Sequence, residues 1–451
     1  MTRGASWCAI DRGCGLIPFQ SGAERVHPPP GTVAARWILL LLAFVVGAAS
    51  EVTAQGRDPD GRLPRPDLVL EHANVVDVRT GAIRGPVSVL VRDGRIANIA
   101  GAIPEDAHRI DLGGRYLLPG LIDAHTHLDN LAAARRALET GVTTVRSASV
   151  GSFRDVALRQ LVRDGFLEGP EVLAAGIFVT PDQGDAVLAD TGLGPLLAGA
   201  RTAERLRMLV RANLAHGVDV IKTRGTERAG RADTDPRQQV YSEAELRVVV
   251  DEAAKAGVPV EAHAHGDEGA RAAVRAGVRS IEHGTYLSDS TLALMRARGT
   301  FLVPTYSTLI DLLEPGGDYD DPVTRARAMH MIPRMERTFR AAHRLGVRIV
   351  TGADVGYGPA SITRVSHEVA NFVRLGMTPL EALRSATTTA AELLGIADRV
   401  GAVEPGLEAD LIVVEENPFD DPVTLQDPLL VMSNGRVAVD RLGFSRRGAG
   451  R

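Results

Sequence analysis

Residues 242–266, SEAELRVVVDEAAKAGVPVEAHAHG, join a helix pattern to a strand pattern. The stretch begins with a serine suited to a helix N-cap, continues with an apolar stripe of helical spacing and reaches a glycine at residue 257. The run that follows, VPVEAHAHG, has the short apolar character of a buried strand. The segment therefore predicts one unit of an alternating α/β fold.

The same alternation extends over residues 121–395. Short apolar runs are separated there by Ala-, Leu-, Arg- and Glu-rich stretches of helical period. These runs are GVTTV (141–145), EVLAAG (171–176), VDVIKT (218–223), RSIEHGT (279–285), TFLVPTYS (300–307) and VRIVTGAD (347–354). Repeated units over ~250 residues fit an α/β, (β/α)8 TIM-type barrel. A doubly wound sheet has the same local pattern, so periodicity alone does not separate the two.

The residues before and after this region have a different sequence pattern. Residues 66–120 and 396–445 contain short strand patterns punctuated by Gly and Asp, such as PVSVLVRDGRIANIA (86–100) and LLVMSNGRVAVD (429–440). Such runs are typical of antiparallel strands and turns. We expect a small flanking β-sandwich domain built from both chain ends, with residues 55–65 as a polar linker before it.

Residues 1–54 are expected to be an N-terminal extension with a signal peptide. Arg36 precedes the apolar run WILLLLAFVVGAA (37–49), and residues 52–54, VTA, suit cleavage after Ala54. Thirteen apolar residues are fewer than the roughly 20 of a membrane span, so we expect export to a periplasm or the exterior and no stable span after cleavage. An uncleaved membrane anchor is the alternative. Cys8 and Cys14, the only cysteines, would leave with the signal.

The composition narrows the class of partner. With 24% charged and 45% hydrophobic residues, the 451-residue chain suits one large globular domain plus a smaller one. The net charge is −5 and no Lys/Arg block is present, which argues against nucleic acid. A small-molecule substrate is expected, and a homo-oligomer remains open.

Polar residues occur where the apolar runs end. In LIDAHTHL (121–128), His125 and His127 are two apart, so both imidazoles point to the same face of a strand, as two ligands of one ion would. Five further candidates end other runs: Lys222, His263, His265, His283 and Asp354. Catalytic groups of a barrel project from these strand ends, so the pattern favours one shared site.

Lys222 is informative because lysine is rare in this chain. The 51 Lys and Arg residues include two lysines, Lys222 and Lys255, which leaves 49 arginines. In an apolar strand a bare ammonium is costly. A buried lysine loses its proton readily, and the neutral amine can add carbon dioxide to form a carbamate, which arginine cannot do. Such a carbamate could bridge two cations.

Together these motifs resemble the amidohydrolase superfamily, and most closely its imidazolonepropionase-like and Xaa-Pro-dipeptidase-like members. The resemblance is carried by PGLIDAHTHL (119–128), Lys222, AHAHG (262–266), IEHG (281–284), TGAD (351–354) and PGLEADLIVV (405–414). It implies two divalent metal ions, with zinc expected from His and carboxylate ligands.

The resemblance also implies individual roles. His125 and His127 would bind the more buried ion, and His263 and His283 the second. Lys222, as N6-carboxylysine, would bridge the two ions. Asp354 would bind the first ion and act as general base while metal-bound hydroxide attacks the substrate.

Three residues are candidate substrate contacts. His265 shares a strand face with His263, and Arg224 and Arg228 lie in the loop after Lys222, where Arg could hold a carboxylate bidentately. Packing and a solvated basic loop are the alternatives. The loops TTVRSAS (143–149) and VTPDQGD (179–185) depart from motifs common in the family, so the substrate is the least determined feature.

The expected reaction is hydrolysis of an amide C–N bond in a dipeptide, an N-acyl amino acid or a cyclic amide. The same metal site could serve an esterase, lactonase or phosphotriesterase, or a metal-dependent decarboxylase. A binding protein with a relict site is the non-enzymatic alternative.

Overall fold

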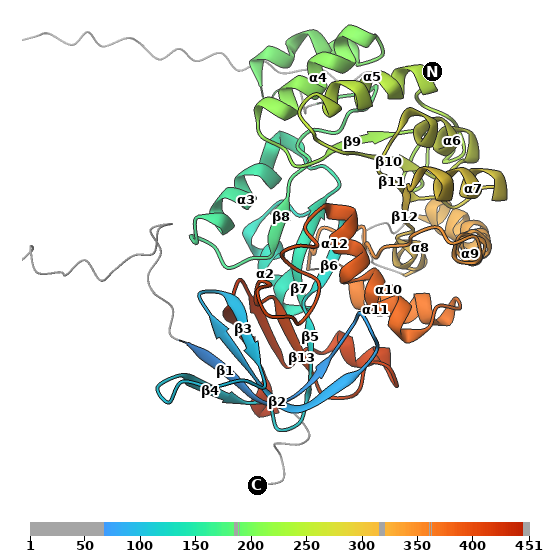
Figure 1. The fold of residues 1–451 in the computed structure, drawn as a ribbon. Coiled ribbons are helices and arrows are strands. Elements are labelled where there is room, and N and C mark those ends of the chain that lie inside the picture. Colours follow the sequence, from blue (N-terminus) through green and yellow to red (C-terminus); the bar gives the residue numbers. More distant parts are fainter. Residues whose placement is uncertain are drawn as a thin grey trace, which may run out of the picture. The chain divides into compact units, whose positions relative to one another are not determined.

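The computed structural model describes residues 67–184, 188, 190–314, 321–359, 361 and 363–444 (Figure 1). The expected signal peptide (1–54), its two cysteines and the linker (55–65) lie outside these residues and stay predictions. Within the described part, no helix is both long and apolar enough to cross a membrane.

Strands from both ends of the described chain form one eight-stranded sheet. Its order is β15-β14-β13-β5-β1-β2-β3, and β4 pairs with β1. The strands are β1 (Leu68–Val76), β2 (Ile83–Arg92), β3 (Arg95–Ile99), β4 (His108–Asp111), β5 (Tyr116–Pro119), β13 (Leu411–Val414), β14 (Leu430–Ser433) and β15 (Arg436–Asp440). The antiparallel β5–β13 pair joins the two ends, with Ile412 opposite Leu118.

This sheet has an apolar core of its own. Leu70, Val75, Leu117, Leu411 and Val413 are fully buried in one cluster, and each such side chain contributes about 1.5–3 kcal/mol of hydrophobic stabilisation. The strands before and after the middle of the chain thus stabilise each other, and their separation as a small flanking domain stays a prediction. Whether this region packs as a sandwich stays a prediction.

The middle of the chain forms parallel strands. One sheet has the order β6-β7-β8 and the other β12-β11-β10-β9. Their strands are β6 (Leu121–Thr126), β7 (Val142–Ser147), β8 (Glu171–Leu173), β9 (Ile221–Arg224), β10 (Val260–Ala264), β11 (Ser280–His283) and β12 (Phe301–Val303). The α/β class predicted from the alternating pattern is confirmed.

Isolated parallel bridges join strands of these two sheets to segments outside the named strands. Val179 pairs with Thr223 of β9, Leu302 of β12 pairs with Ile349, and Thr126 of β6 pairs with Val355. The hydrogen-bonded pairing of these strands does not by itself form a closed barrel. The bridges do bring the carboxyl ends of the strands toward a common edge.

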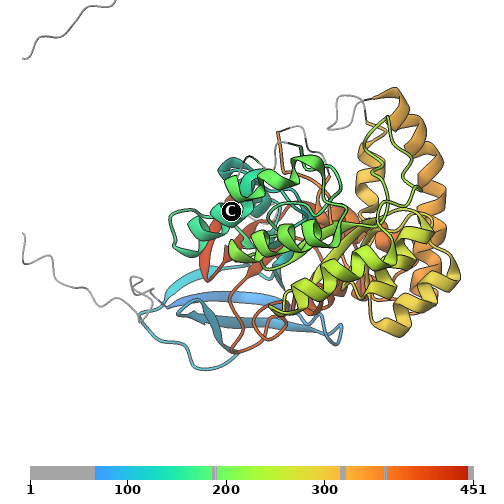
Figure 2. The same ribbon diagram turned by 90° about the horizontal axis from the view of Figure 1, so that it is seen from above.

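Helices separate the parallel strands. They are α2 (Leu131–Glu139), α3 (Arg154–Arg163), α4 (Ala203–Ala215), α5 (Glu243–Ala254), α6 (Asp267–Ala276), α7 (Asp289–Arg298), α8 (Tyr306–Asp311), α9 (Pro322–Arg344), α10 (Val365–Arg374), α11 (Pro379–Ser385) and α12 (Thr388–Leu394), with short 3-10 turns η1 (Gly151–Phe153), η3 (Thr191–Ala198), η4 (Pro422–Gln426) and η5 (Leu442–Phe444). Figure 2 shows the helices coloured green to orange side by side, apart from the blue strands.

The helix predicted from residues 242–257 is confirmed as α5. Ser242 accepts a hydrogen bond from the backbone N–H of Glu245, and the Glu245 side chain accepts one in return from the backbone of Ser242. This capping box satisfies donors that a helix start leaves without partners.

Candidate metal centre and active site

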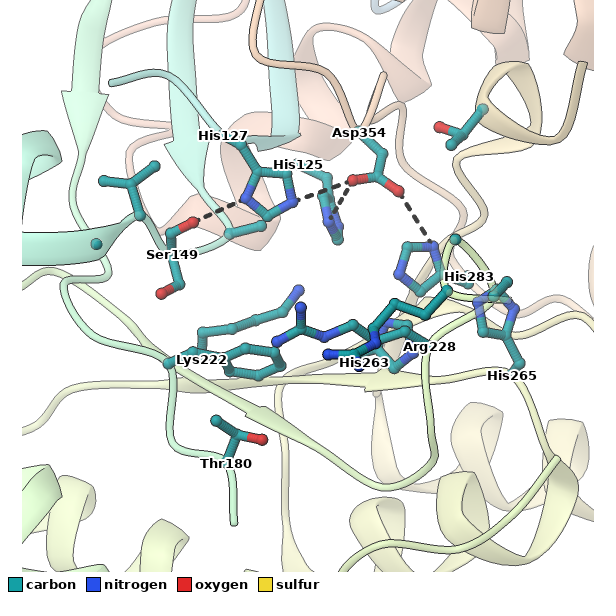
Figure 3. Close-up of a pocket in the computed structure, with 18 of the residues that line it drawn as sticks. His125, His127, Ser149, Thr180, Lys222, Arg228, His263, His265, His283 and Asp354 are labelled. Carbon is teal, nitrogen blue, oxygen red and sulfur yellow. Dashed lines mark hydrogen bonds and ion pairs between the residues drawn. The ribbon is translucent and has the colours of Figure 1, made fainter. Parts of the chain in front are cut away.

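The polar side chains at the strand ends converge on one cavity of about 510 Å³ (Figure 3). Its lining includes Arg228 and the seven residues predicted at the ends of the apolar runs: His125, His127, Lys222, His263, His265, His283 and Asp354. They come from β6, β9, β10, β11 and the segment after the bridge at Ile349, or directly follow those elements. The carboxyl ends of parallel strands are where such sites form.

Asp354 is the centre of the first cluster. Its Oδ1 lies 3.3 Å from His125 Nε2 and 3.2 Å from His127 Nε2, and its Oδ2 lies 3.8 Å from His283 Nδ1. Potential ligand atoms of His125, His283 and Asp354 all lie within 4.8 Å of one another. The spacing of the HxH pair therefore turns both imidazoles toward one carboxylate.

His283 also belongs to a second cluster. Potential ligand atoms of His263, His265 and His283 lie within 4.8 Å of one another. The rings of His265 and His283 are stacked, with centroids 4.6 Å apart, and His263 meets both edge-on. The two clusters share His283, and each has the spacing of side chains that could hold a metal ion.

Hydrogen bonds orient the two imidazoles of the HxH pair. His125 Nδ1 lies 2.7 Å from Oε2 of Glu282, and His127 Nδ1 donates to the backbone carbonyl of Ser149 at 2.7 Å. In both rings the Nδ1 atom is thereby engaged and Nε2 is directed to Asp354. Outer hydrogen bonds of this kind fix the orientation of metal-binding histidines.

His263 is engaged through its other nitrogen. Its Nε2 donates to the backbone carbonyl of Glu227 at 3.0 Å, which leaves Nδ1 as the atom able to bind a cation. His283 Nδ1 shares a hydrogen bond of 2.7 Å with Thr305 Oγ1.

Burial keeps three of the imidazoles neutral. It lowers the pKa of His263 and His283 well below 6.5 and lowers the pKa of His265 to about 3. Neutral imidazole is the form that binds a metal.

Asp354 and His125 behave differently from these three. Burial raises the pKa of Asp354, but the neighbouring His125 outweighs this and holds the pKa well below 3.8. Burial and Lys222 lower the pKa of His125, but the carboxylates of Asp354 and Glu282 raise it above 6.5 overall. An imidazole held between two carboxylates marks a position that favours positive charge.

The backbone is strained at two of these residues. His283 has φ +74° and Asp354 has φ +52°, a region that non-glycine residues seldom adopt. The N–H of Asp354 donates to the His125 carbonyl at 2.8 Å, which ties the turn to β6. Strain of this kind gathers at functional sites, where the surrounding structure maintains it.

Lys222 reaches the cavity from β9. Its side chain is 2% exposed, and Nζ has no hydrogen-bond partner among the described residues. The nearest carboxylate oxygen, Glu261 Oε1, is 3.8 Å away. A buried nitrogen without a hydrogen-bond partner is energetically costly. Lys222 Nζ therefore suits a modification that gives the side chain new polar contacts, such as a carbamate.

A buried charged network that the sequence did not reveal is connected to His125 through Glu282. Arg146 donates from Nη2 to Glu282 Oε1 at 2.9 Å, and its Nε lies 2.8 Å from Glu261 Oε2. The N–H at Nε points instead to the Ala124 carbonyl, so neither oxygen of Glu261 accepts a hydrogen bond. The only sequence signal was a single charged residue inside each of three separate apolar runs.

Asp123 supports the turn that carries Asp354. Its Oδ1 accepts from the backbone N–H groups of His125 and Ala353, and its Oδ2 accepts from the Tyr357 hydroxyl at 2.8 Å. Burial raises the pKa of Asp123 to about 6 despite these donors. One carboxylate thus connects the HxH strand to the turn that follows residues 347–351.

The two candidate arginines are placed differently. Arg228 lines the cavity, with its guanidinium 5.3 Å from the Phe178 ring centroid. Arg224 was expected in the loop after Lys222, but it is the last residue of β9 and does not line the cavity. Its side chain is buried and paired with Glu227 at 3.1 Å and Asp182 at 3.8 Å. The remaining wall combines apolar residues such as Ile177, Phe178 and Leu309 with polar ones such as Asp182 and Gln183.

The fold and this arrangement define a class of metal-dependent α/β hydrolases. A model of the amidohydrolase family matches residues 116–438, most of the chain, and the chain belongs to this family. It is an enzyme, and its relatives in the family are hydrolases that act on carbon–nitrogen bonds.

Three relatives illustrate the similarity. An ochratoxinase from Aspergillus niger is 29% identical over 367 residues, covering 72% of this chain and 75% of that protein. An imidazolonepropionase from Porphyromonas gingivalis is 26% identical over 440 residues, covering 82% and 90%. The crystal structure of a Xaa-Pro dipeptidase with bound methionine in the active site superposes with a TM-score of 0.73 at 28% identity, covering 82% of this chain and 99% of that one.

Proposed function

We propose that this chain is an exported, binuclear metal-dependent amidohydrolase that cleaves an amide C–N bond of a small molecule. The observation that carries the proposal is the amine of Lys222, which is buried without a hydrogen-bond partner in the cavity that both histidine clusters face (Figure 3). The names of the relatives, ochratoxinase, imidazolonepropionase and Xaa-Pro dipeptidase, support an amide substrate.

The donors fit two cations. His125, His127 and Asp354 would hold one ion, and His263 and His283 the other. Lys222, as N6-carboxylysine, would hold both. The buried surroundings also carry the carboxylates of Glu261 and Glu282, so positive charge stabilises the site.

Zinc suits this set of imidazole and carboxylate donors. When bound, the ions would lower the pKa of a water molecule and polarise the carbonyl of the substrate.

Asp354 would move the proton during the reaction. Its carboxylate is ionised and faces the cavity, so it can accept the proton of the attacking water and deliver it to the departing nitrogen. The close approach of Asp354 Oδ1 to His125 Nε2 and His127 Nε2 limits the rotation of this carboxylate. The carboxylate would therefore stay directed to the place where the substrate reacts.

The substrate contacts follow from the cavity wall. Arg228 would bind a carboxylate of the substrate, while Phe178 and Leu309 would contact an apolar group. His265, whose Nδ1 shares a hydrogen bond of 2.9 Å with Thr285, would contact the substrate through Nε2. This wall suits a dipeptide, an N-acyl amino acid or a cyclic amide with an acidic end.

We propose that the domain carrying the site is a (β/α)8 barrel. Strands β6 to β12 and the segment 347–351 would be its eight strands. The bridges from Val179, Leu302 and Thr126 support this closure. Residues 121–395 would then be the barrel domain, and residues 66–120 and 396–445 the flanking domain.

A panel of substrates tests the proposed reaction. Dipeptides, N-acyl amino acids, cyclic amides, esters, a lactone and a phosphotriester would be assayed with purified wild type and Asp354→Asn. We expect amine release from an amide in wild type, and turnover lower by a factor of ~10²–10⁴ in the variant, with much of its metal retained. Turnover confined to esters, lactones or phosphotriesters would contradict the amide substrate. Carbon dioxide release without amine would indicate decarboxylation instead.

A further inference from the structure

The chain between β9 and α5 folds back on itself as a hairpin, residues 225–240, here called the β9–α5 hairpin. Thr226 and Gln239 form an antiparallel bridge. The N–H of Glu227 donates to Gln238 O at 2.9 Å, and the N–H of Val240 donates to Gly225 O at 2.8 Å. These bonds define a stem next to the sheet and a tip, residues 228–237, that extends from it.

The stem is attached to the histidine clusters. The Glu227 carbonyl accepts from His263 Nε2, and Thr226 Oγ1 accepts from the backbone N–H of His265 at 2.9 Å. The Glu227 side chain also accepts from Arg224 at 3.1 Å. Several independent bonds therefore hold the stem in place.

The tip faces the cavity. Four consecutive residues from Arg228 to Arg231 line it. Within the tip, the Thr234 hydroxyl donates to the carbonyls of Arg228 and Arg231. The position of the tip therefore determines where Arg228 meets a substrate.

One side chain from outside the hairpin holds the tip. Arg327, on α9, donates from Nη1 to the carbonyls of Ala229 (2.5 Å) and Arg231 (2.6 Å). From Nη2 it donates to Thr234 O (2.6 Å) and, at 3.4 Å, to Ala232 O. Carbonyl groups that converge in this way repel one another unless a cation lies between them. The planar guanidinium, with five N–H donors, can serve four of them at once.

We propose that Arg327 is a positioning residue that fixes the tip of the β9–α5 hairpin and thereby sets substrate affinity without taking part in metal binding. The kinetic part of this inference rests on the proposed amide hydrolysis, whereas the structural part does not. Because the stem has its own bonds to His263 and His265, loss of Arg327 should loosen the tip alone.

The test compares full-length wild type, Arg327→Ala, Arg327→Lys and the control Arg337→Ala. Arg337 is an exposed arginine on the same helix. Three readouts are taken: the rate of trypsin cleavage within residues 228–237, mapped by mass spectrometry; the bound metal per chain; and kcat and KM on the best amide substrate. Lysine has three donors on one atom and should restore only part of the wild-type behaviour.

We expect Arg327→Ala to be cleaved at the tip at least tenfold faster than wild type and Arg337→Ala. KM should rise about tenfold, with kcat within threefold and metal content unchanged. Tip cleavage and KM equal to those of Arg337→Ala would overturn the proposal. So would loss of metal together with cleavage throughout the chain, because Arg327 would then support the fold in general. If no amide were hydrolysed, the proposed function would fail, and tip cleavage would still decide the structural part.

Discussion

The most informative single substitution at the site is Glu282→Gln. Glu282 Oε2 lies 2.7 Å from His125 Nδ1, and both side chains are buried. Burial raises the pKa of Glu282, but Arg146 and His125 hold it below its ordinary value, so the group is a carboxylate. Glutamine keeps the shape and removes the charge that orients the imidazole.

The expected loss of metal affinity is 10- to 100-fold, the usual effect of removing such an outer partner. This corresponds to about 1.4–2.8 kcal/mol. A buried cation left without its partner would cost about 3–5 kcal/mol of folding stability. Arg146 keeps Glu261 at 2.8 Å, so the loss of stability should fall below that range.

Competition with a chromogenic zinc chelator would measure the affinity, at a temperature where both variants are folded. Glu252→Gln is the matched control, because Glu252 is also buried and accepts from two cations, Arg211 and Lys255, but lies on α5 outside the cavity. Equal zinc affinity in Glu282→Gln, Glu252→Gln and wild type would refute the idea that Glu282 orients His125.

Four further substitutions probe the cavity, a buried carboxylate and the close packing. Arg228→Ala should raise KM about tenfold or more on an amide with a carboxylate and leave KM for an uncharged amide nearly unchanged. Arg224→Ala should mainly lower the melting temperature, because Arg224 is buried, pairs with Glu227 and does not line the cavity. Equal effects of both substitutions on KM would contradict this. Burial raises the pKa of Glu368 from 4.5 to about 7, so the folded chain binds more protons than the unfolded chain over this interval and stability falls as the pH rises through it, by about 3 kcal/mol. Glu368→Gln should therefore flatten the dependence of melting temperature on pH between 4.5 and 7, and an unchanged slope would show that another group is responsible. At Gly352 an added Cβ would lie 2.7 Å from His125 Cβ, so Gly352→Ala should cost about 1–3 kcal/mol in stability and reduce zinc binding, and wild-type zinc content would rule out this contact as a constraint.

Much of the fold could be predicted because its signals are local. The helical stripe and the Ser242 cap specify α5 within a few residues of the chain. Alternation of such units with apolar runs identifies the α/β class. Strands β5 and β13 pair although their residues are almost 300 positions apart in the chain. The strand patterns at the two chain ends suggest this pairing, but they do not specify which residues lie opposite each other.

In the site, too, local features could be predicted from the sequence and long-range contacts could not. The spacing of two in the HxH pair predicts one shared face, and the structure directs both rings to Asp354. The network of Arg146, Glu261 and Glu282 could not be predicted, because each is a single charge inside an apolar run and only the fold brings them together.

The loop after Lys222 illustrates a further limit of the sequence. Arg224 and Arg228 are four positions apart in one segment, and nothing in the spacing says which of them faces the cavity. The hairpin turns Arg228 inward and leaves Arg224 paired with Glu227.

The most direct test of a lysine-bridged pair of metal ions is the metal content of purified wild type, Lys222→Ala and Lys255→Ala, determined side by side by elemental analysis. Lys255 is the matched control because it is the other lysine of the chain and pairs with Glu252 at the end of α5. We predict about two ions per chain in wild type and Lys255→Ala and a clear loss in Lys222→Ala, as expected if Lys222 binds both ions. One ion per chain in all three proteins would contradict the bridge and indicate a mononuclear site.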